Sequence, residues 1–95
     1  METKHICVLA EAYGIPVSPH NFSSGVLLAA TMHLMASVPN ADWLEMDLSK
    51  NAIYEELLVE PLEFHNGYVK VPESPGLGVV LNDDVLNKYC VNIIS

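Results

Sequence analysis

A long apolar stretch with a short extended segment on each side is the feature that most constrains the fold of this chain. The stretch reads VLLAATMHLMASV at 26–38, and the flanking segments read IPVSP at 15–19 and DWLEMD at 42–47. Apolar residues recur along it at helical spacing, namely Val26, Leu27, Ala30, Leu34 and Val38. This recurrence predicts a helix with a wide apolar stripe. A helix between two short apolar strands is typical of a right-handed crossover between parallel strands, so the pattern predicts an α/β fold.

Capping residues predict where the helices of the first half begin and end. The segment TKHICVLAEAY at 3–13 has apolar residues at helical spacing, and Gly14 follows it as a common helix stop. Ser23 or Ser24 is positioned to cap the helix at 26–38.

The second half of the chain predicts shorter elements. SKNAIYEELL at 49–58 has room for one or two helical turns, and LEFHNGYVKV at 62–71 alternates around the Asn-Gly pair at 66–67. That pair favours a two-residue type I′ turn and hence a β-hairpin. The final stretch, NDDVLNKYCV, predicts a short helix capped by Asn82 or Asp83.

Composition argues against several classes of protein. Half of the 95 residues are apolar, which argues against disorder, and the net charge of -8 disfavours binding to nucleic acid or to an anionic membrane surface. The chain has no apolar run of about 18–20 residues and no signal-peptide pattern, so we expect no membrane span and a cytoplasmic location. Cys7 and Cys90 are expected to be two thiols, although the sequence leaves a disulfide open.

His20 and Glu45 are the polar residues that stand out on this apolar framework. His20 directly follows the first predicted strand, and Glu45 lies between Leu44 and Met46 in the second. The carboxyl ends of parallel strands are where α/β sheets build their sites, so both side chains are expected at one edge. A buried carboxylate requires a partner, a proton or a function. Read singly, each has a structural alternative: a loop histidine, or a strand-end carboxylate in a salt bridge.

The residues also carry a resemblance to a known family. AEAYGIPVSPHNFSSGVLLAATMHLMASVPNADWLEMD and GYVKVPESPGLGVVLNDDVLNKY resemble the C-terminal end of enolase-superfamily enzymes of the mandelate racemase and muconate lactonizing type. The resemblance implies a (β/α)₈ TIM-type barrel with a capping domain. Residues 15–19 would be the seventh barrel strand and 42–47 the eighth. Residues 1–50 would then end the barrel, and 51–95 would return towards the capping domain.

The resemblance also implies site residues. His20 would move the proton α to a carboxylate, and Glu45 would hydrogen-bond the substrate carboxylate as it becomes an enediolate. Asn21, Phe22 and Ser23 would line the mouth of the site and contact the substrate. Such an enediolate needs a positioned base and strong electrostatic stabilisation.

Magnesium is the cofactor that the resemblance implies, with carboxylate ligands on barrel strands outside this chain. Within the chain, His5, His33 and His65 have no metal-ligand spacing with each other or with the cysteines, so no metal site is expected here. A barrel also needs about 200–250 residues. We therefore expect a fragment that is inactive alone.

Two hypotheses about function follow. In the first, the chain is the C-terminal part of a magnesium-dependent sugar-acid dehydratase or 2-hydroxy-acid racemase, with a small carboxylate substrate. In the second, it is a non-catalytic α/β binding or structural module derived from the barrel. The unpaired edges of 15–19 and 42–47 also predict a homo-oligomer, either through sheet extension or through exchange of the hairpin at 62–71. A monomer with the hairpin folded over one edge is the alternative.

Overall fold

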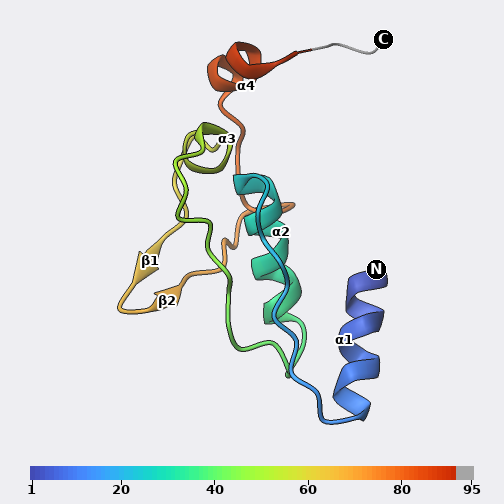
Figure 1. The fold of residues 1–95 in the computed structure, drawn as a ribbon. Coiled ribbons are helices and arrows are strands. Elements are labelled where there is room, and N and C mark those ends of the chain that lie inside the picture. Colours follow the sequence, from blue (N-terminus) through green and yellow to red (C-terminus); the bar gives the residue numbers. More distant parts are fainter. Residues whose placement is uncertain (92–95) are drawn as a thin grey trace.

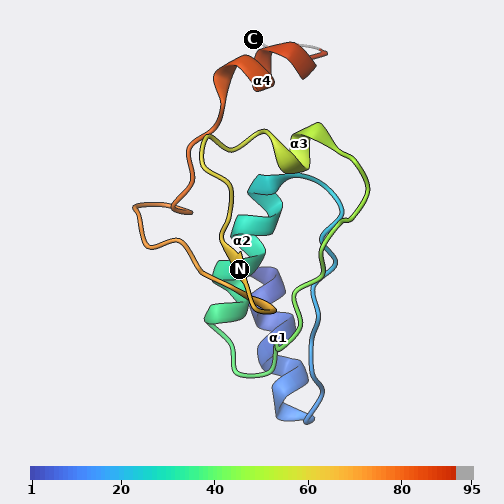
Figure 2. The ribbon, with the colours of Figure 1, turned by 90° about the vertical axis from the view of Figure 1, so that its left-hand side faces the viewer.

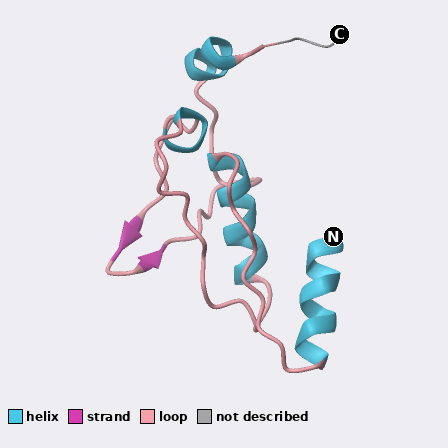
Figure 3. Ribbon diagram, in the orientation of Figure 1, coloured by secondary structure: helices cyan, strands magenta, loops and turns pink. Residues whose placement is uncertain are grey.

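The computed structural model describes residues 1–91 and contains four helices and one hairpin within them (Figures 1 and 3). In chain order the elements are α1 (Glu2–Ala12), α2 (Gly25–Ala36), α3 (Ala52–Glu55), β1 (Phe64–His65), β2 (Tyr68–Val69) and α4 (Asp83–Tyr89). The predicted C-terminal part, 51–95, extends into residues 92–95, which lie outside the described range.

The helix ends follow the local chemistry of the sequence. Ser24 caps α2, because its hydroxyl accepts a hydrogen bond from the Leu27 amide at 3.4 Å. Asn82 caps α4, and its side-chain oxygen accepts from the amides of Asp84 and Val85. These contacts confirm one of the two caps that the sequence left open for each helix.

The buried face of α2 differs from the predicted stripe. Leu28 and Met32 are almost fully buried, whereas Leu27 is 37% exposed. The predicted stripe is therefore wrong in its orientation. Within GVLLAATMHLMA only Thr31 and His33 are polar, so apolar residues cover every face and periodicity cannot select one.

The two predicted parallel strands form no ladder, which corrects that prediction for residues 1–91. Segments 15–19 and 42–47 are extended and run in the same direction alongside α2 (Figure 2), but neither is assigned as a strand. The hydroxyl of Ser18 donates to the Trp43 carbonyl at 3.0 Å. Pro16 and Pro19 have no amide hydrogen, so this segment has few donors for a ladder.

The predicted hairpin is confirmed. Phe64 pairs with Val69 and His65 pairs with Tyr68 in antiparallel register. The turn residues Asn66 and Gly67 have φ angles of 49° and 78°. Two positive φ angles in a row are the requirement of a type I′ turn, and the Asn-Gly pair meets it.

A small core joins the first half of the chain to the second. Leu28 and Met32 of α2 are buried together with Tyr54 of α3, and further apolar residues pack against them: Leu44, Met46, Leu62, Val69 and Val71. Cys7 is a buried free thiol in α1, and its carbonyl accepts from the Asn40 side chain at 2.9 Å. Within residues 1–91, no helix has the length and apolarity needed to cross a bilayer.

The loop between the hairpin and α4 provides a test of this packing. Gly76 and Gly78 both have positive φ, but only at Gly78 would an added Cβ collide, at 2.4 Å from the Pro72 Cβ. Gly78→Ala should therefore lower the free energy of unfolding by about 1–3 kcal/mol more than Gly76→Ala does, because overpacking adds to the shared backbone strain. Urea denaturation of both variants measures the difference. Equal losses would contradict the close packing of Gly78 on Pro72.

Candidate functional site

His20 and Glu45 lie in contact. The His20 Nδ1 atom is 2.8 Å from Glu45 Oε1, and their side chains are 78% and 37% exposed. His20 follows the extended segment at 15–19, and Glu45 lies within the parallel segment at 42–47. The reversal of the chain through α2 therefore brings together two residues that the sequence predicts at one edge.

Asn21 fixes the Glu45 side of this contact. Its backbone amide donates to Glu45 Oε1 at 2.7 Å, and its side-chain Nδ2 donates to the Glu45 carbonyl at 3.2 Å. The Asn21 side chain is fully buried and accepts a hydrogen bond from the Thr31 hydroxyl at 3.0 Å. Asn21 thus lies beneath the contact of His20 with Glu45 and supports it from within.

Phe22 and Ser23 continue the segment outward. The Phe22 ring stacks on the His20 ring with centroids 5.1 Å apart and an interplanar angle of 12°, and Phe22 is 54% exposed. The Ser23 carbonyl accepts from the Asn51 side chain at 3.3 Å. Of the three residues predicted at the mouth, Phe22 is the one that places its side chain against the imidazole.

The contact between the imidazole and the carboxylate favours one proton arrangement. A carboxylate at Nδ1 favours the tautomer that carries its hydrogen on Nδ1, which leaves the lone pair on Nε2. The largely exposed His20 can then accept a proton at Nε2. The same carboxylate, once protonated, can donate a hydrogen bond to an oxygen atom of a ligand.

The described residues do not form a metal centre. Among residues 1–91, no three His, Cys, Asp or Glu side chains lie close enough to hold a metal ion. Asp47 is buried near Glu45, but its Oδ1 accepts from the amide and the hydroxyl of Ser49 at 2.8 and 2.6 Å.

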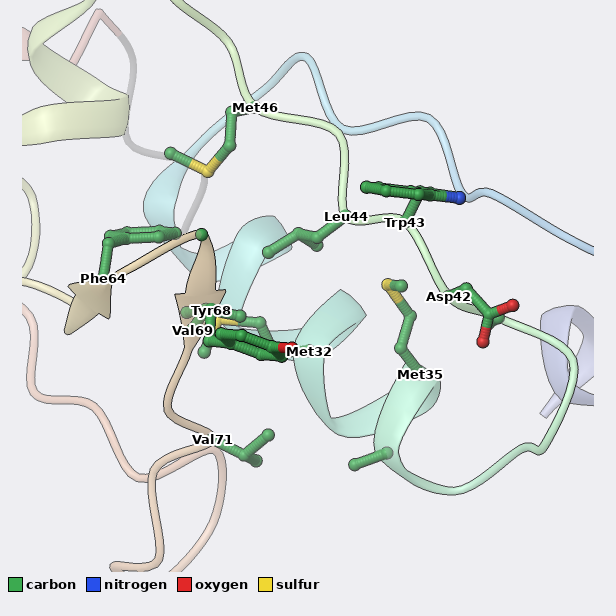
Figure 4. A pocket seen from close by; sticks show the side chains of 13 residues that line it. Met32, Met35, Asp42, Trp43, Leu44, Met46, Phe64, Tyr68, Val69 and Val71 are labelled. Atoms are coloured by element: carbon green, nitrogen blue, oxygen red, sulfur yellow. The ribbon is translucent and has the colours of Figure 1, made fainter.

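The molecule also has an apolar hollow (Figure 4), and its lining includes neither His20 nor Glu45. It has a volume of about 750 Å³, and its lining includes Met32, Leu44, Phe64 and Tyr68. It lies between α2, the 42–47 segment and the hairpin. Its lining offers few polar groups for acid–base chemistry, so the pair of titratable side chains at His20 and Glu45 is the stronger candidate site.

Thr31 is the site-supporting residue that the sequence analysis missed. Its signal was its polarity, because it is one of two polar residues in an otherwise apolar helix. His33, the other polar residue, lies with Nε2 2.8 Å from the Leu77 carbonyl and so joins α2 to the loop before α4.

Comparison with known proteins identifies relatives along almost the whole chain. The family model described as Enolase C-terminal domain-like matches residues 1–85. Arabinonate dehydratase of Saccharolobus solfataricus is 36% identical over 81 residues, which are 85% of this chain and 21% of that enzyme. D-galactarolactone cycloisomerase of Agrobacterium fabrum is 34% identical over 93% of this chain and 25% of its own length. The chain thus spans a quarter or less of these two relatives.

Solved structures agree in fold as well as in sequence. The crystal structure of mandelate racemase/muconate lactonizing enzyme from Jannaschia sp. CCS1 superposes on this chain with a TM-score of 0.82 at 34% sequence identity. The matched region covers 99% of this chain and 24% of the Jannaschia chain. A family match over residues 1–85 and relatives above 30% identity along most of the chain lead to one assignment. The chain belongs to the enolase superfamily, within its mandelate racemase and muconate lactonizing enzyme type.

Proposed function

We propose that this chain is the C-terminal part of a magnesium-dependent enzyme that abstracts the proton α to a carboxylate, and that it is inactive alone. The observation that carries the proposal is the 2.8 Å contact between His20 Nδ1 and Glu45 Oε1. This contact brings together an imidazole, which could act as a base, and a carboxyl group, which could donate a hydrogen bond to a substrate. In the complete barrel, residues 15–19 and 42–47 would be the seventh and eighth strands, 1–50 would end the barrel domain, and 51–95 would lead to the capping domain.

His20 is the proposed base, and Glu45 is the proposed stabiliser of the enediolate. An α-proton next to a carboxylate is very weakly acidic, so removing it requires stabilisation of the negative charge that develops on the carboxylate oxygens. His20 would take or return the proton at Nε2. Glu45 would share a proton with the substrate carboxylate, and Phe22, stacked on His20, would limit where the substrate lies.

Magnesium would supply charge stabilisation when bound, as the family resemblance implies. Because residues 1–91 gather no group of three ligands, the ligands would come from outside this chain. The steps assigned to His20 and Glu45 are proton transfer and hydrogen bonding, and both are made by their own side chains.

The proposed substrate is a sugar acid or a 2-hydroxy acid. Dehydratases of arabinonate and of D-xylonate are among the relatives, at 36% and 37% identity, and they support a sugar-acid dehydratase over a racemase. A cytoplasmic location suits an enzyme of small soluble acids. The alternative is a non-catalytic α/β binding or structural module derived from the barrel.

Substitution of either proposed catalytic residue tests the assignment in the complete protein. His20→Asn and Glu45→Gln should each lower kcat by on the order of 10²–10⁴-fold, because each removes a proton-transfer or charge-stabilising group. The matched controls are His65→Asn and Glu63→Gln, both exposed and within the hairpin segment at 62–71. Turnover of a panel of sugar acids and exchange of the α-proton in deuterated water are the measurements. Normal exchange of both enantiomers by His20→Asn would disprove its role as the base.

The isolated chain tests where the metal ligands lie. With magnesium and the same panel of acids, the chain should show no turnover and no tight magnesium binding, because the described residues contain no ligand cluster. Isothermal titration calorimetry measures the affinity. A dissociation constant in the micromolar range would contradict ligands outside the chain.

The isolated chain should also self-associate. Trp43 is 81% exposed, Leu9 64%, and Ile6 and Ile15 more than half, so large apolar side chains face solvent along α1 and both extended segments. Exposed apolar surface of this kind favours pairing with a second copy. Analytical ultracentrifugation at micromolar concentration should show a dimer or larger species. A single monomeric species with cooperative unfolding would contradict this prediction. It would favour the alternative in which the hairpin folds over the edge of one extended segment.

A further inference from the structure

Asn21 is completely buried and forms hydrogen bonds both to α2 and to the segment at 42–47. Its side chain has no exposed surface, and both of its polar groups are hydrogen-bonded, with Oδ1 accepting from Thr31 and Nδ2 donating to the Glu45 carbonyl. A buried amide must satisfy both ends or lose the solvation of the unpaired one. The side chain is therefore held in a single orientation between α2 and the segment that carries Glu45.

The backbone amide of the same residue reaches the Glu45 carboxylate. Asn21 N lies 2.7 Å from Glu45 Oε1, and this oxygen is also the one 2.8 Å from His20 Nδ1. Both contacts thus fall on Oε1. When Glu45 is protonated, an oxygen that already accepts from a donor is a poor place for the hydrogen, so the hydrogen goes to Oε2.

Thr31 holds this arrangement from α2. It is 5% exposed, and its hydroxyl donates to Asn21 Oδ1 at 3.0 Å. Because the Glu45 carbonyl can only accept, the Nδ2 end of the Asn21 amide faces it, and the Thr31 hydroxyl donates to the Oδ1 end. Thr31 of α2, the buried Asn21 and Glu45 are thus linked one to the next by hydrogen bonds.

We propose that Asn21 and Thr31 are positioning residues that fix the Glu45 carboxylate and select Oε2 as the oxygen that meets the substrate. Neither residue needs to touch the substrate for this role. The inference rests on the proposed function, in which Glu45 hydrogen-bonds the substrate carboxylate as it becomes an enediolate. Displacement of a catalytic group by about 1 Å can lower a rate by about 100-fold, so an orienting contact of this kind affects turnover directly.

The test uses the complete protein and replaces one hydroxyl. Thr31→Val keeps the shape of the side chain and removes its donor, so kcat should fall by roughly 10- to 100-fold while KM changes by less than about threefold. Thr31→Ser keeps the donor and should recover kcat to within about threefold of the parent. Ser37→Ala is the matched control, because it removes a hydroxyl from the end of the same helix that bonds the Leu34 carbonyl instead.

A second variant keeps the inference testable if Thr31→Val does not fold. Asn21→Asp can still accept from Thr31, but it has no side-chain donor for the Glu45 carbonyl and places a negative charge near the carboxylate. Its kcat should fall by at least tenfold. Circular dichroism and thermal unfolding of each variant show which of them are folded.

The outcomes separate the inference from the proposed function. If Glu45→Gln leaves turnover intact, the proposed function fails. If Glu45→Gln abolishes turnover but folded Thr31→Val, or folded Asn21→Asp in its place, keeps kcat within twofold of the parent, the positioning role is refuted. Equal losses in Thr31→Val and Thr31→Ser would also refute it, because the loss would then not depend on the hydroxyl, which only Thr31→Ser retains.

Discussion

The hydrogen bonds of one buried amide hold this structure together at its site. The two extended segments beside α2 share no strand ladder, and Asn21, which follows the first segment, bonds to Glu45 in the second through its backbone and its side chain. Thr31 adds the connection to the helix. An unpaired buried polar group costs about 1–3 kcal/mol, so these bonds fix the geometry around Glu45 as well as the packing of α2.

The segment at 42–47 has two chemically different sides, and the site uses one of them. Leu44 and Met46 pack against the core formed with α2 and α3. Trp43 is 81% exposed, and Glu45 meets His20. Successive side chains of an extended segment point in opposite directions, so a single short stretch joins the core to the contact with His20. The packing of Leu44 and Met46 thereby fixes the position of the Glu45 carboxylate relative to the core.

Local chemistry explains which features could be predicted from the sequence. The Asn66-Gly67 turn and the helix caps depend on neighbouring residues, and the contact of His20 with Glu45 follows from the crossover pattern. The buried face of α2 could not be found, because its residues are apolar on all sides. The role of Thr31 depends on a residue ten positions away in the chain, and no local pattern reports such a bond. The two segments form no ladder because of the prolines in 15–19. The apolar pattern of this segment gives no sign of their effect on strand pairing.

Those prolines have a second effect, on the unfolded chain. Pro16 and Pro19 restrict their own φ angles and disfavour helical conformations in the residues before them. The segment that presents His20 therefore samples few conformations even before folding, and it loses less conformational entropy when it becomes ordered. In an assembled barrel, a strand that is already extended can dock against its neighbours at a smaller entropic penalty. The His20 imidazole, which follows this segment, would then be held at the site by a segment with few accessible conformations.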